Sequence, residues 1–267
     1  MTIKLAIAGA GGRMGRMLLD AACMDPELAV SAALEQPASP LIDADASVLL
    51  PELRGLTVRA DAATALKGCD VLIDFTRPEA TLAYLAICQT LGVNAVIGTT
   101  GFTSAQKQEI EGFSRHIAIV FAPNMSVGVN VTLKLVEMAA RSLGLDYDIE
   151  VHEAHHKMKV DAPSGTALKL GEVAAAARGQ TLADAGVYAR HGVTGERKPG
   201  TIGFSVVRAG DIIGDHTVFF AGTGERIEIT HKSSSRATYA QGAVRAAKFL
   251  ADKKTGLYDM QDVLGLE

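Results

Sequence analysis

The sequence has few cysteines, few prolines, no surplus of positive charge and no long apolar run. Its 267 residues include 3 Cys and 8 Pro, and the formal net charge is −4. The cysteines, Cys23, Cys69 and Cys88, are far apart, lack C-x-x-C spacing and have apolar neighbours. We therefore expect buried free thiols rather than disulfides, metal ligands or nucleophiles.

These absences also exclude classes of partner. An isoelectric point near 6.0 argues against a nucleic acid or an anionic membrane surface as the main partner. No stretch reaches the ~18 apolar residues of a membrane helix, and the apolar start MTIKLAIAGAGG is too short for a signal peptide. We expect a cytoplasmic protein with no nucleic-acid or membrane partner.

Residues 3 to about 122 alternate short apolar runs with helical patterns. The predicted strands are 3–8, 28–34, 71–75, 93–98 and 117–122, and the predicted helices are 13–24, 79–91 and 104–114. Strands that are apolar on both faces and alternate with helices indicate a parallel sheet covered on both sides. We therefore expect an α/β domain of the Rossmann type.

The pattern changes after residue 124. The segment YDIEVHE (147–153) alternates apolar and polar residues, as a half-exposed strand does. Helices are expected at 128–143, 164–178 and about 237–252, and antiparallel strands at 201–210, 216–222 and 225–232. The last helix can pack back on the first domain. We predict a dinucleotide-binding domain of residues 1–124 and 237–267, and an inserted α+β domain of residues 125–236 with a mixed or antiparallel sheet.

A glycine-rich turn joins the first predicted strand to the first helix. The segment AIAGAGGRMGRMLL contains Gly9, Gly12 and Gly15 as G-x-x-G-x-x-G rather than the strict G-x-G-x-x-G. Glycines permit a tight turn, so backbone N–H groups at the helix start can approach a pyrophosphate. Glu35 follows the second strand, 20 residues after Gly15, at the spacing of an acid that accepts hydrogen bonds from the adenosine ribose. An ordinary tight turn and a surface glutamate are the alternative.

The residue after this acid bears on the choice of cofactor. Gln36 is not a cation, and the carboxylate of Glu35 repels a 2′-phosphate, which favours NADH. Arg13 or another base can still admit NADPH.

Two further loops, DFTRP (74–78) and GTTG (98–101), follow predicted strands. Ligands of open α/β sheets bind outside the carboxyl ends of the strands. The candidates for hydrogen bonds to the cofactor are Gly98, Thr99 and Thr100, although each loop can also simply cap the next helix.

Residues 152–156, HEAHH, match the H-E-x-x-H pattern of zinc metalloproteases. A zinc site of that kind needs both histidines four apart on one helix, whereas the alternation before it is that of a strand. Lys157 and Lys159 follow at once and disfavour a divalent cation. We expect no metal; a zinc hydrolase is the alternative, and sensitivity to a chelator would be its mark.

The same stretch suits an anion and proton-transfer site. Four cationic donors lie within five residues: His155, His156, Lys157 and Lys159. The following PSGTAL (163–168) opens a helix whose free N–H groups suit a carboxylate. Together they can clamp a small dicarboxylate at both ends, whereas solvated surface charges are the alternative.

Six segments stand in order along nearly the whole chain: GAGGRMG, DFTRPEATL, GTTG, FAPNMSVGVN, EAHHKMKVDAPSGTAL and THKSSSRATYAQGA. Together they resemble the 4-hydroxy-tetrahydrodipicolinate reductase family, also called dihydrodipicolinate reductase. The histidine–lysine stretch joined to DAPSGTA is the specific motif, and the glycine loop is not. The resemblance implies that NADH or NADPH delivers hydride to a cyclic, unsaturated dicarboxylic acid with loss of water, in lysine and diaminopimelate synthesis.

The resemblance also implies roles for residues. His155 would be a proton donor and acceptor, and Lys159 a proton donor. The substrate carboxylate would be bound by His156, Gly165 and Thr166. The cofactor would be held by Gly9, Ala10, Gly11, Gly12, Arg13, Met14, Glu35, Gly98, Thr99, Thr100, Ala122, Pro123, Asn124 and Met125. A homotetramer built through the sheet of the second domain is implied too, and Gln36 departs from family members that carry Arg after the ribose acid.

Two other functions stay open. Another two-domain NAD(P) oxidoreductase, such as an amino-acid dehydrogenase, would share the glycine loop but not the histidine–lysine stretch beside SGT. A non-catalytic NAD(P)-binding sensor would bind NADH and turn over no cyclic imine.

Overall fold

The computed structural model describes residues 2–266 and divides into two compact units. Unit 1 comprises Met1–Val127 with Ala237–Glu267, and unit 2 comprises Gly128–Arg236. The first boundary lies after residue 127, against the 124 expected from the sequence, and the second lies after residue 236.

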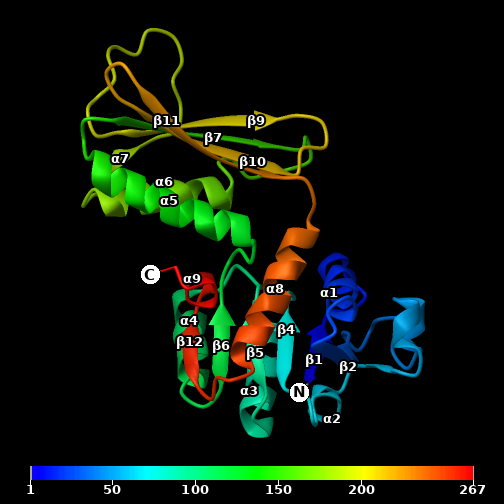
Figure 1. Ribbon diagram of the computed structural model, residues 1–267. Coiled ribbons are helices and arrows are strands. Elements are labelled where there is room, and N and C mark those ends of the chain that lie inside the picture. Colours follow the sequence, from blue (N-terminus) through cyan, green and yellow to red (C-terminus); the bar gives the residue numbers. More distant parts are fainter. Residues whose placement is uncertain (1, 267) are drawn as a thin grey trace. The chain divides into compact units, whose positions relative to one another are not determined.

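Unit 1 is built on a seven-stranded sheet with the order β12-β6-β5-β4-β1-β2-β3, in which all neighbours are parallel (Figure 1). Its strands are β1 (Ile3–Ala8), β2 (Leu28–Leu34), β3 (Val58–Arg59), β4 (Val71–Asp74), β5 (Asn94–Ile97), β6 (Ala118–Phe121) and β12 (Gly256–Tyr258). The predicted α/β class and the five predicted strands are confirmed. The sequence did not predict β3 and β12, because so few residues carry no periodic pattern.

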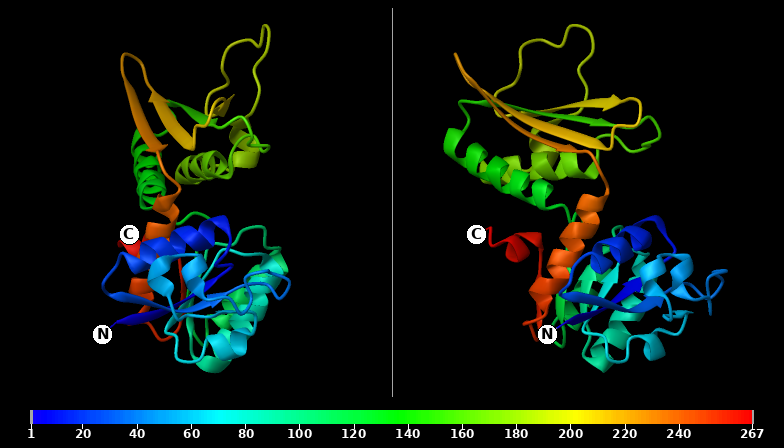
Figure 2. Two further views of the ribbon diagram at one scale, coloured as in Figure 1. Left: turned by 90° about the vertical axis from the view of Figure 1, so that its right-hand side faces the viewer. Right: turned by 45° about the vertical axis from the view of Figure 1, so that its right-hand side comes forward.

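Helices cover both faces of this sheet, as the two views of Figure 2 show. The helices are α1 (Arg13–Cys23), α2 (Ala62–Ala65), α3 (Pro78–Leu91), α4 (Ser104–Phe113), α8 (Ala237–Leu250) and α9 (Met260–Leu264), with short 3₁₀ turns η1 (Ala46–Val48) and η2 (Pro51–Leu53). In the core on one side, α1 packs against β1 and β2, and α8 packs against β4, β5 and β6; in the core on the other, α3 packs against β5 and α4 packs against α3. The prediction that the last helix returns to the first domain is confirmed.

Unit 2 is a five-stranded sheet with helices packed on one face (Figures 1 and 2). Its order is β11-β10-β7-β9-β8. The elements are α5 (Val127–Leu143), β7 (Asp148–His155), α6 (Gly165–Ala177), α7 (Leu182–Ala185), β8 (Gly186–Val187), β9 (Ile202–Arg208), β10 (Gly214–Ala221) and β11 (Arg226–Ser233). The sheet is mixed, because β7 pairs antiparallel with β10 and parallel with β9.

One sequence prediction in this unit is wrong. The three strands after residue 200 were expected to form an antiparallel series, and only β10 and β11 do so. The strand β9 is separated from β10 by β7, so the connection between β9 and β10 crosses over a strand. The pairing of β9 with β7 joins segments that are far apart in the sequence, so the turn residues next to β9 do not indicate it.

The predicted alternation of β7 is confirmed and extends further than expected. Ile149 and Val151 are buried on the face that packs against the helices. Because side chains of a strand alternate with period two, the same face continues to Glu153 and His155, both of which are buried. The inner face of the sheet therefore ends in charged and polar groups rather than in apolar ones.

The cysteines are free thiols, but their burial differs. Cys69 and Cys88 are buried and Cys23 is exposed at the end of α1. The expectation of a buried Cys23 is wrong: Cys23 is the last residue of α1 and its side chain is exposed, although Leu19, one turn earlier on the same face, is buried. Among the described residues, no helix is both long and apolar enough to span a membrane.

A close approach in unit 1 gives a test of the packing. A Cβ at Gly242 in α8 would lie 1.7 Å from the carbonyl oxygen of Met125, whereas a Cβ at Gly112 in α4 would meet nothing within 4 Å. We expect Gly242→Ala to lower the free energy of unfolding by roughly 1–3 kcal/mol through overpacking. Gly112→Ala, its matched helical control, should raise it by about 0.5–1 kcal/mol. Urea denaturation of both variants measures the difference, and equal stability of the two would contradict the packing.

Candidate functional site

The glycine loop is shaped so that backbone, not side chains, lines the start of α1. Gly9 has a left-handed φ of 65° at the end of β1, and the N–H of Gly12 donates to its carbonyl oxygen at 2.9 Å. A Cβ at Gly15 would lie 2.1 Å from the same oxygen, so only glycine lets the helix pack this closely on the turn. The residues present thus fit a dinucleotide, because a helix start without obstructing side chains exposes N–H groups to a pyrophosphate.

The predicted ribose acid lies against this loop. Glu35 Oε1 accepts a hydrogen bond from the N–H of Gly11 at 2.9 Å, and Oε2 accepts one from the N–H of Gln36 at 3.1 Å. The backbone of the loop therefore holds the carboxylate in place at the end of β2. Its remaining lone pairs suit a pair of ribose hydroxyls.

The loops after β4 and β5 share a buried polar cluster. Asp74 is 1% exposed, and its Oδ1 accepts hydrogen bonds from the N–H and the hydroxyl of Thr76 at 2.8 and 2.6 Å. Burial raises the pKa of the Asp74 carboxyl, against the lowering effect of the threonine hydroxyls around it. Thr99 is also buried, and its hydroxyl accepts from Thr81 at 3.2 Å. We therefore expect Thr99 to contact a cofactor through its backbone rather than through its hydroxyl.

The predicted cofactor loops lie at one edge of the sheet. They follow β1, β4, β5 and β6, which are parallel neighbours, so their carboxyl ends coincide. In the last loop the N–H of Ala122 donates to Ile97 at 3.2 Å, Met125 is buried, and Asn124 Oδ1 accepts from Ser126 at 2.9 Å. The structure thus brings Gly9–Met14, Gly98–Thr100 and Ala122–Met125 to the edge where dinucleotides bind in this class of fold.

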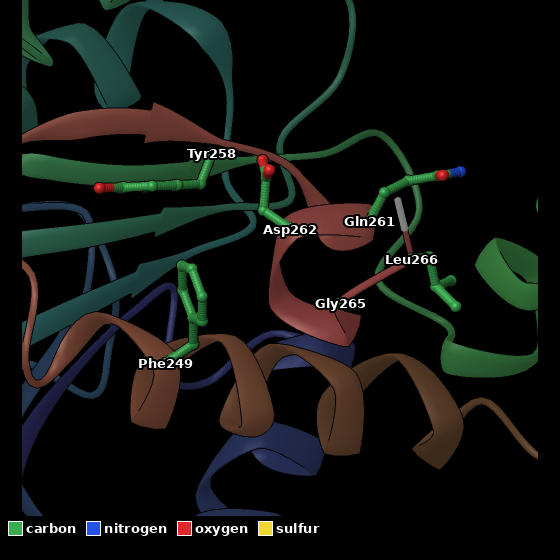
Figure 3. Close-up of a pocket in the computed structure, with 6 residues that line it drawn as sticks. All are labelled: Phe249, Tyr258, Gln261, Asp262, Gly265 and Leu266. Atoms are coloured by element: carbon green, nitrogen blue, oxygen red, sulfur yellow. The ribbon is translucent and has the colours of Figure 1, made fainter.

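A further pocket in unit 1 is lined by residues outside these loops. It measures about 280 Å³ and is lined by Phe249, Tyr258, Gln261, Asp262, Gly265 and Leu266 (Figure 3). None of the predicted site residues lines it. Its volume is just below the range of about 300–1,000 Å³ that small-molecule sites show, so we assign it no role.

Unit 2 carries the predicted proton-transfer residues at the end of β7. Glu153, which is 0% exposed, receives a bidentate pair of hydrogen bonds from the guanidinium of Arg208, both at 2.8 Å. The same carboxylate contacts Nδ1 of His155 at 2.5 Å and accepts from the N–H of Ser164 at 3.0 Å. A charged network, which the sequence did not predict, thus connects His155 to Arg208 of β9 and to Ser164 at the start of α6.

The charge of Glu153 follows from its partners. Burial raises the pKa of its carboxyl, but the hydrogen bonds from Arg208, His155 and the N–H of Ser164 outweigh burial and hold the pKa below the usual range. Glu153 is therefore ionised at neutral pH, although water does not reach it.

A second histidine completes the cluster from the neighbouring strand. His216 of β10 is 5% exposed, and its Nε2 lies 3.0 Å from the hydroxyl of Ser164. Its ring stands edge-on to that of His155, with centroids 5.1 Å apart. Burial, and after it the charge of His155, lowers the pKa of His216 to about 4, so this ring is neutral at pH 7.

Lys159 and His156 also have partners. Lys159 Nζ forms an ion pair with Asp161 Oδ1 at 2.7 Å. A guanidinium nitrogen of Arg236 lies 3.5 Å from Nε2 of His156. The sequence interpretation placed Lys159 among cations alone, and Asp161 corrects that: the ammonium has a carboxylate beside it.

The predicted helix start is confirmed. Helix α6 begins at Gly165, and Ser164 is its N-cap, with its hydroxyl accepting from the N–H of Ala167 at 3.1 Å. Gly165 and Thr166 are thus in the first turn, where the positive end of the helix dipole attracts anions. Ser164 donates its own N–H to Glu153, which ties the anion site to the proton-transfer residues.

The zinc interpretation finds no support in the geometry. HEAHH lies at the end of a strand, so His152 and His156 do not share a helix face, and Nδ1 of His152 lies 2.9 Å from the hydroxyl of Ser205. Within residues 2–266, no group of three or more His, Cys, Asp and Glu side chains is placed to hold a metal ion.

Comparisons with known proteins agree along the whole chain. Residues 3–125 match the family model described as dihydrodipicolinate reductase, N-terminus, and residues 128–264 match the model of its C-terminus. A protein of Cupriavidus pinatubonensis named 4-hydroxy-tetrahydrodipicolinate reductase is 60% identical over 265 residues, which cover 99% of this chain and 100% of the relative. The protein of the same name from Nitrosospira multiformis is 59% identical over 265 residues, with coverage of 99% and 98%.

Solved structures share the architecture. Dipicolinate-bound dihydrodipicolinate reductase from Paenisporosarcina sp. TG-14 gives a TM-score of 0.79 at 24% identity, over 98% of this chain and 99% of that one. An amine dehydrogenase from Mycobacterium smegmatis gives 0.60 at 12% identity, over 96% and 94%. At these identities the two structures support the fold alone.

The buried neutral His216 predicts a dependence of stability on pH. Its pKa is about 4 in the folded protein and about 6.5 in an unfolded chain. As the pH falls, the unfolded state binds the proton first, so stability is fully present above pH 6.5 and is lost down to pH 4. Between pH 7 and pH 5 this group should cost about 2 kcal/mol.

Urea denaturation at both pH values measures this loss. His216→Gln should reduce the loss, while His191→Gln, at an exposed position, should leave it unchanged. The same loss in both variants would show that His216 is not the responsible group.

Proposed function

The chain belongs to the dihydrodipicolinate reductase family, whose models match residues 3–125 and 128–264. From this premise we propose that it reduces 4-hydroxy-tetrahydrodipicolinate to tetrahydrodipicolinate with loss of water, using NADH or NADPH, in lysine and diaminopimelate biosynthesis. The observation that carries the proposal is the polar end of β7. There His155 is joined through Glu153 to the first turn of α6, so a proton-transfer group and an anion site belong to one network.

The residues of unit 2 divide the chemistry among them. A bound nicotinamide supplies hydride to the conjugated imine of the substrate. The electron-rich carbon or nitrogen that results needs a proton, and Lys159 and His155 provide it. The substrate carboxylate binds at His156 and at the N–H groups of Gly165 and Thr166, where the helix dipole favours negative charge.

The residues of unit 1 hold the cofactor. The loop Gly9–Met14 would hold the pyrophosphate at the positive start of α1, and Glu35 would bind the adenosine ribose. The loops Gly98–Thr100 and Ala122–Met125 contact the nicotinamide half. NADH is the preferred cofactor, because the Glu35 carboxylate repels a 2′-phosphate and Gln36 supplies no compensating charge.

The assembly and the location follow from the same premise. The protein is a cytoplasmic homotetramer whose contacts use the sheet of unit 2. The terminal strand β11 of this sheet supports the assembly, because it has one neighbour only and most of its residues are at least partly exposed. Unpaired strand edges are the part of a sheet that pairs with another chain.

Oxidation of NADH followed at 340 nm tests the proposed function. The substrate is generated in the cuvette from pyruvate and aspartate semialdehyde by its synthase. We expect substrate-dependent oxidation that a chelator does not inhibit, with a higher kcat/KM for NADH than for NADPH. No oxidation with either cofactor, given active synthase and folded protein, would contradict the proposal.

A charge change beside Glu35 tests the origin of the preference. Gln36→Arg should shift the ratio of kcat/KM values toward NADPH by roughly tenfold, the effect of one new charged hydrogen bond to a phosphate. Gln89→Arg adds the same charge at an exposed position of α3 and should leave the ratio unchanged. A ratio that favours NADPH in the unaltered protein would overturn the preference.

Two lysines two residues apart test the proton donor. General acids contribute typically ~10²–10⁴ in rate, so we expect Lys159→Ala to lower kcat more than tenfold while the Kd for NADH stays within about twofold. Lys157→Ala, at an exposed position of the same loop, should retain kcat. Steady-state kinetics and cofactor titration give both numbers, and near-normal turnover of Lys159→Ala would remove this residue from the mechanism.

A further inference from the structure

The carboxylate of Glu153 has a donor at each of its four in-plane acceptor positions. Oε1 accepts from the N–H of Ser164 at 3.0 Å and from Arg208 at 2.8 Å. Oε2 accepts from Arg208 at 2.8 Å and lies 2.5 Å from Nδ1 of His155. An ionised carboxylate offers acceptors only, so Nδ1 of His155 must carry the proton in this contact.

Arg208 fixes the plane of that carboxylate. Its two terminal nitrogens bind both oxygens in parallel, the arrangement that gives an arginine–carboxylate pair its directional specificity. One of them also donates to the carbonyl oxygen of Asp161 at 2.6 Å, which holds the guanidinium from a second side. The carboxylate therefore cannot turn away from His155 without breaking a buried charge pair.

We propose that Glu153, fixed by Arg208, is a positioning residue that holds His155 as the Nδ1–H tautomer and so presents Nε2 for proton exchange. The inference rests on the proposed function for the identity of the reaction, but not for the tautomer itself. The alternative tautomer would place the proton on Nε2 and leave Nδ1 facing an anion without a hydrogen. Its cost is that of a lost charged hydrogen bond in a buried site.

The Nε2 side of the His155 ring faces a glycine. A Cβ at Gly214 would lie 3.0 Å from Nε2 of His155. Glycine at this position of β10 therefore leaves room beside the nitrogen that the tautomer presents.

Glu153→Gln is the informative variant, because the direction of its amide can be worked out. An NH₂ in place of Oε1 would face two donors, Ser164 and Arg208. An NH₂ in place of Oε2 would face one donor, Arg208, and could donate to Nδ1 of His155. The second orientation is less costly, and it requires His155 to carry its proton on Nε2.

Two measurements read this change. Long-range ¹⁵N–¹H correlation NMR of histidine-labelled protein distinguishes the two tautomers, with the His155 signals assigned from their loss in His155→Asn. We expect the Nδ1–H tautomer in the unaltered protein and the Nε2–H tautomer in Glu153→Gln. In the reductase assay kcat should fall roughly 10²-fold or more, as when a buried acid that orients a histidine is made neutral, with the KM for NADH unchanged.

Glu150→Gln is the matched control. Glu150 lies on the same strand and binds two arginines, Arg190 and Arg197, but on the other face of the sheet. Its replacement removes a comparable charge network without touching His155. We expect the tautomer and kcat of this variant to equal those of the unaltered protein.

A fallback covers loss of folding. If the unpaired charge of Arg208 prevents Glu153→Gln from folding, the double variant Glu153→Gln, Arg208→Met removes that charge and should show the same tautomer change. An Nδ1–H signal together with unchanged kcat in the folded variant overturns the inference. A changed tautomer in a protein that has no reductase activity before mutation overturns the proposed function and leaves the positioning role standing.

Discussion

The buried carboxylate of Glu153 constrains the polar end of unit 2 more than any other group. A charge removed from water is costly unless donors surround it, and here they come from β9, from the start of α6 and from β7 itself. The ends of β7 and β9 and the start of α6 are therefore placed so that their donors reach the carboxylate. Arg208 extends the constraint to Asp161, the partner of Lys159. His155, Lys159 and the start of α6 thus belong to one network of hydrogen bonds and ion pairs, and the residue at its centre, Glu153, is fully buried.

Unit 1 meets the opposite requirement, because a dinucleotide needs backbone donors that nothing else occupies. Parallel strands bring successive loops to one edge of the sheet, and the close packing at Gly15 keeps side chains away from the start of α1. Glu35 is the exception, and the N–H groups of Gly11 in the loop and of Gln36 hold its carboxylate in place. Unit 1 therefore exposes backbone donors by keeping side chains away, whereas unit 2 positions its polar groups by many hydrogen bonds between side chains.

The sequence predicts the architecture well where a pattern is local. The buried strands of unit 1, the helix that opens at Gly165 and the alternation of β7 all depend on neighbours within a few residues. The place of β9 beside β7 does not, and it was predicted wrongly. The exposure of Cys23, the last residue of α1, was predicted wrongly as well. Glu153 was within reach: the period-two pattern that puts Ile149 and Val151 inside also puts Glu153 inside, and a buried acid demands partners. Its partner Arg208 is 55 residues away in the sequence, and no local pattern points to it.

The central claim is that the hydride of a reduced nicotinamide cofactor is transferred to the dicarboxylate substrate. Its most direct test is the fate of isotope from NADH deuterated at both C4 positions. With substrate generated by its synthase in ordinary water, tetrahydrodipicolinate analysed by mass spectrometry should contain one deuterium per molecule. Product without deuterium, or oxidation of the cofactor without product, would contradict the claim.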